Sequence, residues 1–323
     1  MRFGSNTYNV FLALLRRSLW QEEDIKGKFP LTSTQWDEIY RMSWVQAVTG
    51  LLYDAIEGLP KNSGLNSAQI ARWMSSARFI EENNAMMNAA INNMALEWKA
   101  HGITAIVQKG RNVARMYPRP EHRVSGDIDW YFPSRNDWEK ALALVQSYKP
   151  ETDSDGDLHY TRNGIVVEHH RHGSDPDDPV SVLIMINEHI LHHAMVMGIG
   201  YRHFCDMALG YKYYKGKYDP EVLRGKLRRL HLLRWTHLLN TFLIEVMGMP
   251  EEYLPFPVKG RHGTAVLEFL VINDGNLGLE KDHRMDGLNM RSKLFLHYAP
   301  VRFLSRYTGL AFGRLLRIVK NKE

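Results

Sequence analysis

The amino-acid sequence predicts an α+β fold, in which a small mixed sheet with helices is flanked by helical regions on both sides. Three observations predict it. Residues 1–101 carry the three-and-four apolar spacing of helices, residues 102–179 hold short strand-like runs with a hairpin turn, and residues 180–323 return to the helical spacing. We therefore expect an N-terminal helical region, a compact α/β core and a C-terminal helical region with these boundaries.

The N-terminal region is expected to form three helices, at residues 6–19, 33–56 and 67–100. Ser33 stands at the start of the second helix, where a hydroxyl side chain caps free backbone N–H groups. In the third helix the apolar side chains recur on one face, so its methionines are expected in a core rather than as ligands.

The central region changes period after Gly102. The expected elements are a strand at 103–107, a short helix at 112–117, a strand at 128–132, a helix from 134 to about 148, and two strands at 159–162 and 165–169. Asn163-Gly164 joins the last two strands, and this dipeptide favours a tight hairpin turn. These elements make the predicted mixed sheet.

The C-terminal region returns to helical spacing. Helices are expected at 180–198, 203–214, 220–230, 232–246 and, at the basic end, 303–320. The basic end alternates Arg302, Arg306 and Arg314 with aromatic and aliphatic residues, which would suit peripheral contact with an anionic membrane or with nucleic acid. Docking on the body of the protein, with the charges in water, is the alternative and the favoured one.

Composition sets limits on the class of protein. The 323 residues are 44% hydrophobic and 24% charged, and the net charge of +5 is a mild basic excess. One cysteine, Cys205, excludes an intramolecular disulfide and a cysteine-rich zinc site. No apolar run approaches the roughly 20 residues that span a bilayer, and no signal peptide is recognised. A cytoplasmic protein without a transmembrane segment is expected.

Two aspartates in the strand at 128–132 and its approach form the main candidate site. Residues two apart on a strand project from the same face, so Asp127 and Asp129 are expected to place their carboxylates side by side. Glu168 ends the apolar run 165–167 and would face them if its strand lies next to theirs. Such like charges repel unless a cation lies between them, and Mg²⁺ prefers oxygen ligands of this kind.

Basic residues near this site are candidates for phosphate binding. Lys109 and Gly110 follow the strand at 103–107 and supply a cation and a flexible backbone at the start of a helix. Arg123 lies four residues before Asp127, and a guanidinium can clamp a phosphate with two hydrogen bonds. We therefore predict that Lys109, Gly110 and Arg123 contact a nucleotide.

These residues together resemble a known family. Lys109-Gly110, Tyr117-Pro118, Arg123, Asp127-Ile128-Asp129 and Val167-Glu168-His169 resemble the uncharacterised nucleotidyltransferase family of the DNA polymerase beta superfamily, from about residue 102 to 171 and more loosely to 206. The resemblance implies the nucleotidyltransferase fold for the core, Mg²⁺ with Mn²⁺ as the alternative ion, a nucleoside triphosphate as substrate, and Asp127, Asp129 and Glu168 as catalytic metal ligands. The wider superfamily has Gly-Ser where this chain has Lys109-Gly110-Arg111, so triphosphate handling is expected to differ.

The predicted function is transfer of a nucleoside monophosphate from a nucleoside triphosphate such as ATP to a hydroxyl of an unknown small-molecule or protein acceptor. The alternative is a non-catalytic protein of the same fold that contacts nucleic acid or membrane through its basic C-terminal helix.

Histidines and acidic turns offer other metal sites, for which the sequence favours simpler interpretations. His189 and His193 are four residues apart and share a helix face; we expect core or surface positions, with lining of the active-site cleft as the alternative. His169 and His170 point to opposite sides of their strand, so at most one can approach Glu168. The acidic turns at 153–157 and 175–178 lack EF-hand spacing and are expected to be solvated.

Overall fold

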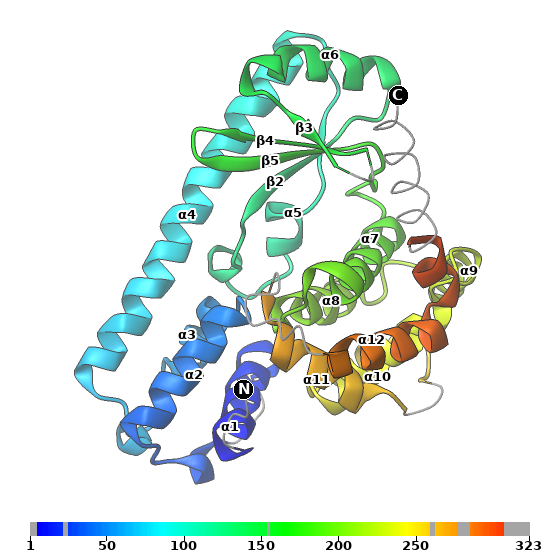
Figure 1. Cartoon of the computed structure of the whole chain (residues 1–323). Coiled ribbons are helices and arrows are strands. Elements are labelled where there is room, and N and C mark those ends of the chain that lie inside the picture. The colour runs from blue at the N-terminus through cyan, green and yellow to red at the C-terminus, as the bar shows by residue number, and fades with distance from the viewer. Residues whose placement is uncertain (1–4, 22–24, 154–155, 259–261, 277–284, 307–323) are drawn as a thin grey trace.

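The computed structural model describes residues 5–21, 25–153, 156–258, 262–276 and 285–306. It confirms the predicted fold class, because one five-stranded mixed sheet is combined with many helices (Figure 1). The helices lie before, around and after the sheet in the order that the sequence predicts.

The N-terminal helices are α1 (Ser5–Trp20), α2 (Ser33–Val45) and α3 (Thr49–Ile56). The continuous helix expected at 33–56 is therefore wrong: the chain breaks between α2 and α3, where Ala47 adopts a positive φ of 54°. Thr32 caps α2 in a reciprocal pair of hydrogen bonds with Gln35. The break lets both short helices bury their apolar faces against α1.

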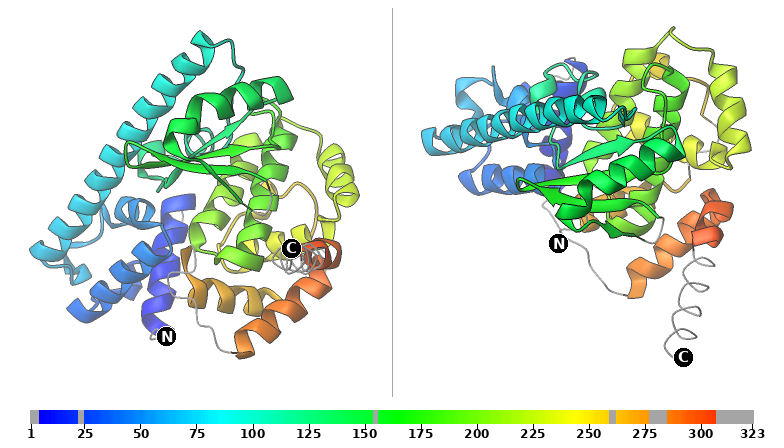
Figure 2. Two further views of the ribbon diagram at one scale, coloured as in Figure 1. Left: turned by 45° about the horizontal axis from the view of Figure 1, so that its top comes forward. Right: turned by 90° about the horizontal axis from the view of Figure 1, so that it is seen from above.

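Helix α4 (Ser67–Ala100) has the bounds that the sequence predicts and connects two hydrophobic cores. Near its start Trp73 packs in the large helical core, whereas Met87, Ile91, Met94 and Trp98 pack in the core of the sheet. Figure 2 shows α4 running from the N-terminal helices along the side of the sheet. The buried face of α4 is narrower than the sequence predicts, because Met86, which was expected in a core, is 51% exposed.

The sheet has the strand order β1-β2-β5-β4-β3. The strands are β1 (Ile106–Val107), β2 (Asp127–Tyr131), β3 (Glu151–Thr152), β4 (Leu158–Arg162) and β5 (Ile165–His170). Only β2 and β5 are parallel; the other neighbours are antiparallel. Strand β1 is shorter than expected, β3 is not predicted by the sequence, and the β4–β5 hairpin at Asn163-Gly164 is confirmed.

The two faces of the sheet differ. On one face Ile128, Trp130 and Val167 pack against α4 and α6 (Arg135–Val145). Because side chains alternate along a strand, Asp127, Asp129, Glu168 and His170 project from the opposite face. The acidic residues therefore lie on the face away from the core of the sheet. The short helix α5 (Arg111–Ala114) follows β1.

The C-terminal half contains α7 (Pro179–His192), which continues as a π-helical segment His193–Met197, and α8 (Tyr201–Tyr214), which packs against it. The remaining helices are α9 (Pro220–Arg229), α10 (Leu233–Glu245), α11 (Thr264–Asp274) and α12 (Met285–Tyr298). The sequence patterns do not predict α11 and α12. The expected basic helix at 303–320 lies mostly outside the described residues, which end at 306.

One helical stretch of the described chain, Pro179–Met197, has the length and composition of a membrane span. More than half of its apolar window, 56%, is buried inside the fold. Core helices of globular proteins have this property as well, and α7 packs against α8 in this way.

Candidate active site on the open face of the sheet

Asp127, Asp129 and Glu168, here called the carboxylate cluster, come from adjacent strands. The register of β2 and β5 pairs Asp129 directly with Glu168 and Asp127 with Val166. The expectation that the strand of Glu168 lies next to that of the aspartates is therefore confirmed. Parallel pairing brings both side chains to the same face at the same height of the sheet.

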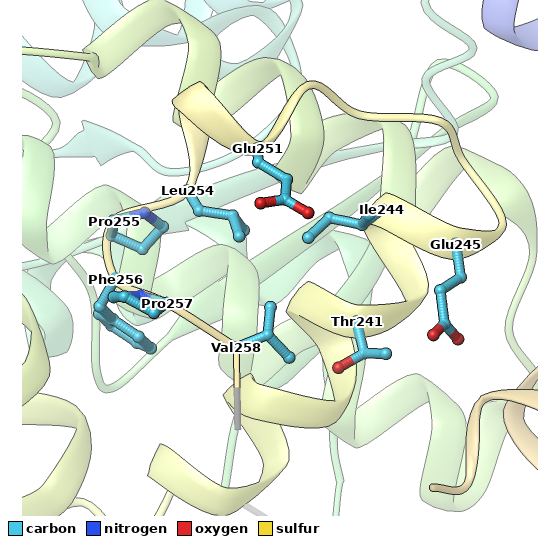
Figure 3. Close-up of a pocket in the computed structure, with 9 residues that line it drawn as sticks. All are labelled: Thr241, Ile244, Glu245, Glu251, Leu254, Pro255, Phe256, Pro257 and Val258. Carbon is cyan, nitrogen blue, oxygen red and sulfur yellow. The ribbon is translucent and has the colours of Figure 1, made fainter. Parts of the chain in front are cut away.

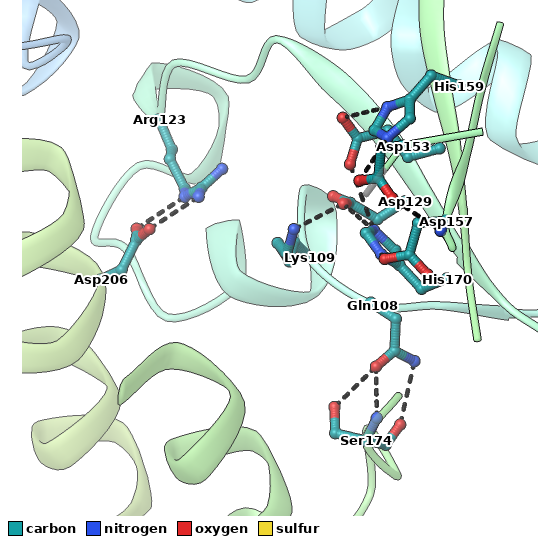
Figure 4. Close-up of polar contacts among 11 residues, drawn as sticks. Gln108, Lys109, Arg123, Asp129, Asp153, Asp157, His159, His170, Ser174 and Asp206 are labelled. Atoms are coloured by element: carbon teal, nitrogen blue, oxygen red, sulfur yellow. Dashed lines mark hydrogen bonds and ion pairs between the residues drawn. The ribbon is translucent and has the colours of Figure 1, made fainter. Parts of the chain in front are cut away.

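Asp129 is the most enclosed member of the carboxylate cluster, with a fully buried side chain. Its Oδ1 atom accepts hydrogen bonds from Lys109 Nζ and from His170 Nε2, both at 2.7 Å (Figure 4). Its Oδ2 atom is buried and has no hydrogen-bond partner among the residues that the structure describes. Both cations thus bind the same carboxylate oxygen, and the other oxygen has no hydrogen bond from a described residue.

His170 is held between two acids that the sequence alone did not bring together. Its Nε2 faces Asp129, and its Nδ1 lies 2.8 Å from Asp157 Oδ2. Because both ring nitrogens face carboxylates, both act as donors in the protonated ring. Asp157 belongs to an acidic turn expected to be solvated, and that prediction is wrong for this half-buried residue. Strand alternation with Glu168 is the signal that points to His170.

Glu168 lies at the more open side of the carboxylate cluster, with its side chain 20% exposed. His159, on the neighbouring strand β4, places Nδ1 3.1 Å from Glu168 Oε1, and His170 Nε2 lies 3.4 Å from Oε2. Glu168 thus has imidazole neighbours on both carboxylate oxygens.

The protonation equilibria reflect this arrangement. Burial favours the neutral form of Asp129, but Lys109 and His170 outweigh it and hold the pKa of that carboxyl well below its usual range. Repulsion by Asp129, together with burial, raises the pKa of Asp127, and burial with repulsion from both aspartates raises the pKa of Glu168. Burial lowers the pKa of His170, but its bonds to Asp129 and Asp157 raise it to about 9. Two of the three carboxylates are therefore destabilised as anions, which a bound cation would relieve.

Lys109 and Gly110 reach this site because Gln108 fixes the end of β1. The backbone N–H of Gln108 donates to Asp129 O, and its side chain exchanges hydrogen bonds with Ser174 in the loop after β5 (Figure 4). Gly110 has φ 54° and ψ −116°, a conformation that residues with a Cβ rarely adopt. The chain therefore turns sharply after Lys109 and points the ammonium group at Asp129.

Arg123 lies in a buried ion pair, apart from Lys109. Its Nε and Nη2 atoms each lie 2.8 Å from a carboxylate oxygen of Asp206 on α8 (Figure 4). Tyr117 also donates to Asp206. Helix α4 supports the same loop, because Asn84 donates to the carbonyl oxygens of Glu121 and Arg123. Two of the guanidinium nitrogens are thereby committed to Asp206. The phosphate contact predicted for Arg123 stays a prediction.

A cavity of about 370 Å³ opens beside the carboxylate cluster, between α4 and α5. Asp127, Ser125, Gly110, Arg111 and Arg115 contribute to its wall. This size is within the range of small-molecule sites. The wall carries both signs of charge, because Glu81 and Glu121 line it together with Asp127 and the two arginines. An anionic ligand would therefore contact the arginines, with a cation between it and Asp127.

A second cavity, of about 410 Å³, lies in the C-terminal helices (Figure 3). Thr241, Leu254, Phe256, Glu245 and Glu251 are among its lining residues. Its lining includes no member of the carboxylate cluster and no lysine or arginine of the described chain. The first cavity is therefore the better match for an anionic substrate.

The donor set at the carboxylate cluster fits a divalent cation. Asp129 and Glu168 offer oxygen atoms that lie, with a ring nitrogen of His170, within 4.8 Å of one another; Asp127 is not part of this set. The protonated His170 would have to lose a proton before it could coordinate, so the carboxylates are the ligands that are ready to bind. The unpartnered Asp129 Oδ2 and the raised pKa values of Asp127 and Glu168 are both features that a cation would compensate. Oxygen-rich sites of this kind suit Mg²⁺ or Mn²⁺.

Comparison with known proteins identifies a family model that matches the part of the chain containing this site. Residues 32–183 match the family model described as an uncharacterised nucleotidyltransferase. The match begins at the capped start of α2, ends in α7 and includes the whole sheet and the carboxylate cluster. No curated protein and no solved structure matches the chain significantly. The predicted resemblance is thus confirmed, and the chain contains a nucleotidyltransferase domain.

Proposed function

We propose that the nucleotidyltransferase domain at residues 32–183 transfers a nucleoside monophosphate from a nucleoside triphosphate, such as ATP, to a hydroxyl of a small-molecule or protein acceptor. The observation that carries this proposal is the buried Asp129 Oδ2 atom, which has no hydrogen-bond partner among the described residues. A buried anionic oxygen without a partner is costly, and a metal ion at this position would remove that cost.

Asp127, Asp129 and Glu168 would hold the cation, Mg²⁺ or Mn²⁺. When bound, the cation neutralises the triphosphate and polarises the attacking hydroxyl. In its absence Lys109 and His170 supply the positive charge at Asp129, with 2.7 Å contacts to Oδ1. These two residues therefore keep Asp129 ionised and oriented.

In the transfer step the acceptor oxygen attacks the α-phosphorus. The bond from that phosphorus to the bridging oxygen of the β-phosphate breaks, and pyrophosphate leaves with that oxygen. Glu168 accepts the hydroxyl proton, because its carboxylate is partly exposed and lies at the more open side of the cluster. Arg111 and Arg115, which line the cavity beside Asp127, orient the phosphates.

The test is transfer of label in cell extract. The full chain is incubated with Mg²⁺ and each of the four α-³²P-labelled ribonucleoside triphosphates, and labelled small molecules and proteins are separated. We expect label on one acceptor and a loss of at least about 10³-fold in rate for Asp129→Asn, because a metal-dependent displacement loses its main charge stabilisation.

The matched control is Asp37→Asn, the same substitution at an aspartate that pairs with Arg72 on the surface of α2. It should label the acceptor at the wild-type rate. Equal labelling by the wild type and by Asp129→Asn would refute the assignment. No label with any triphosphate would favour a non-catalytic binding protein.

A further inference from the structure

Three histidines meet between α7 and α8, in the part of the chain that follows the family match. His189 lies on α7, His193 begins the π-helical segment, and His203 lies on α8. Their ring centroids are separated by 4.4 Å (His189–His193), 4.3 Å (His193–His203) and 5.4 Å (His189–His203). These residues are called the histidine cluster below.

Helix geometry explains how the rings converge. His189 and His193 are four residues apart and share one face of α7, which is the spacing that lets two histidines bind one metal ion. The π-helical segment begins at His193, and such segments occur often at functional sites. His203 enters from α8, so the cluster joins two packed helices.

Backbone contacts leave ring nitrogens for a ligand. His193 Nδ1 lies 3.2 Å from Gly198 O. His203 Nδ1 lies 3.2 Å from Gly200 O and 3.3 Å from Gly200 N, so it donates to that carbonyl in one tautomer and accepts from that N–H in the other. In the tautomer that donates Nδ1–H to the carbonyl, each ring presents Nε2 as a lone pair, which is the usual arrangement of metal ligands. His203 is fully buried, and its Nε2 atom has no hydrogen-bond partner within the described part of the chain.

The charge state of the rings suits metal binding. Burial lowers the pKa of His193 to about 3 and holds the pKa values of His189 and His203 well below the usual range, with Arg202 adding to the effect on all three rings. All three imidazoles are therefore neutral near pH 7, and the neutral ring is the form that coordinates metal. One ligand atom from each ring lies within 4.8 Å of the others.

We propose that His189, His193 and His203 form a binding site for a first-row transition-metal cation, with Zn²⁺ as the preferred ion. Three imidazole ligands suit Zn²⁺ and exclude Mg²⁺, which requires oxygen ligands. His189 and His203 also line a small cavity that Lys109 and Arg123 border. The volume of this cavity, about 10 Å³, is close to the least that holds one water molecule, which could serve as a fourth ligand.

The site would be chemically distinct from the carboxylate cluster. The carboxylate cluster offers oxygen ligands beside His170, whereas the histidine cluster offers only ring nitrogens. At high concentration a transition-metal ion could still enter both sites, so the test must separate the two.

The experiment titrates the chelator-treated full chain with Co²⁺ alone, in excess Mg²⁺ to occupy oxygen sites, and follows the visible absorption of tetrahedral Co²⁺. We expect one equivalent to bind, to be displaced by Zn²⁺ and to resist Mg²⁺. His189→Gln is the main variant because His189 is half-buried and tolerates substitution best. It should weaken binding by about 100-fold or more, since a three-ligand site loses one ligand.

Two matched controls locate the ion. His192→Gln changes the neighbouring ring on α7, and His170→Gln removes the histidine beside the carboxylate cluster. Both should keep the Co²⁺ spectrum and the single equivalent. Circular dichroism reports whether each variant is folded.

Two results would overturn the proposal. One is the absence of a tetrahedral Co²⁺ spectrum in the wild-type chain, which needs no variant. The other is loss of binding in His170→Gln with retention in His189→Gln, which would assign the ion to the carboxylate cluster. Neither result depends on nucleotidyl transfer, so the proposed function is tested separately.

Discussion

The carboxylate cluster and the histidine cluster solve the problem of buried polar groups in opposite ways. In the first, Asp129 contacts the cations Lys109 and His170 directly, so opposite charges compensate one another inside the protein. In the second, burial keeps three imidazoles neutral, and backbone carbonyls satisfy two of the rings. Each cluster still leaves one buried atom without a partner among the described residues, Asp129 Oδ2 and His203 Nε2.

The difference teaches which ion each cluster would accept. Ionised carboxylates that repel one another favour a hard divalent cation, whereas neutral imidazoles favour a softer transition-metal ion. Arg123 and Asp206 border the small cavity beside the histidine cluster. Like Asp129 with Lys109, they form a buried pair of opposite charges. The following experiments test the comparison, beginning with the largest expected effect.

Arg123→Met should lower the free energy of unfolding by about 3–5 kcal/mol, because Asp206 would remain buried without its cation. Urea unfolding followed by circular dichroism measures the loss. Arg78→Met is the control, since Arg78 and Glu82 form a solvent-exposed pair whose loss should leave the free energy of unfolding almost unchanged.

The double variant Arg123→Met, Asp206→Leu should recover much of the stability lost in Arg123→Met, because the Asp206 carboxylate is then no longer buried without Arg123. A loss below about 1 kcal/mol in the single variant would show that water reaches Asp206. In that event Arg123 would be available for the predicted phosphate contact.

Mg²⁺ with ATP should stabilise the wild-type chain by about 2.7 kcal/mol when the complex is present at 100 times its dissociation constant. Thermal unfolding measures this shift. Asp129→Asn should abolish it, whereas Asp37→Asn should retain it, because only Asp129 belongs to the carboxylate cluster.

The outcome also separates the two clusters. If Zn²⁺ binds only the histidine cluster, its stabilising effect should persist in Asp129→Asn. Loss of both effects in this folded variant would mean that the two clusters share one ion, and the comparison would fail.

The smallest effect is expected at His122, a buried histidine that, like His170, contacts carboxylates. Its ring lies between Asp54 and Glu81, with Nδ1 and Nε2 at 2.6 Å and 2.9 Å from their carboxylates. Burial lowers its pKa and Arg119 opposes protonation, but the hydrogen bonds to the two acids raise the pKa above the usual value. The protonated ring therefore contributes stability fully below about pH 6.5, and the contribution is lost as pH rises through the folded-state pKa.

His122→Gln should accordingly lose more stability at pH 5.5 than at pH 8.5, as measured by urea unfolding across this range. His101→Gln, an exposed histidine at the end of α4, is the control and should follow the wild-type profile. A loss that is equal at both pH values would indicate that His122 is neutral in the folded protein, like the histidine cluster.

Much of the fold and part of the site follow from local sequence. The periodicity of α4 and the Asn163-Gly164 hairpin are local patterns, and the structure has both where they were predicted. Strand alternation likewise puts Asp127 with Asp129, and Glu168 with His170, on one face. The break at Ala47 is not local in this sense, because it depends on how α2 and α3 pack against α1.

The sequence by itself determined the α+β class, the order of helices and sheet, and the candidate carboxylates, because residues two or four apart have fixed relative directions on a strand or helix. Tertiary structure alone decided which partners these residues meet. It places β5 beside β2 and brings Lys109 and His170 to the same oxygen of Asp129. It also pairs Arg123 with Asp206 and places His203 of α8 next to His189 and His193. Such pairings depend on long-range packing, in which distant segments bury their apolar faces together, and no local period of the sequence encodes them.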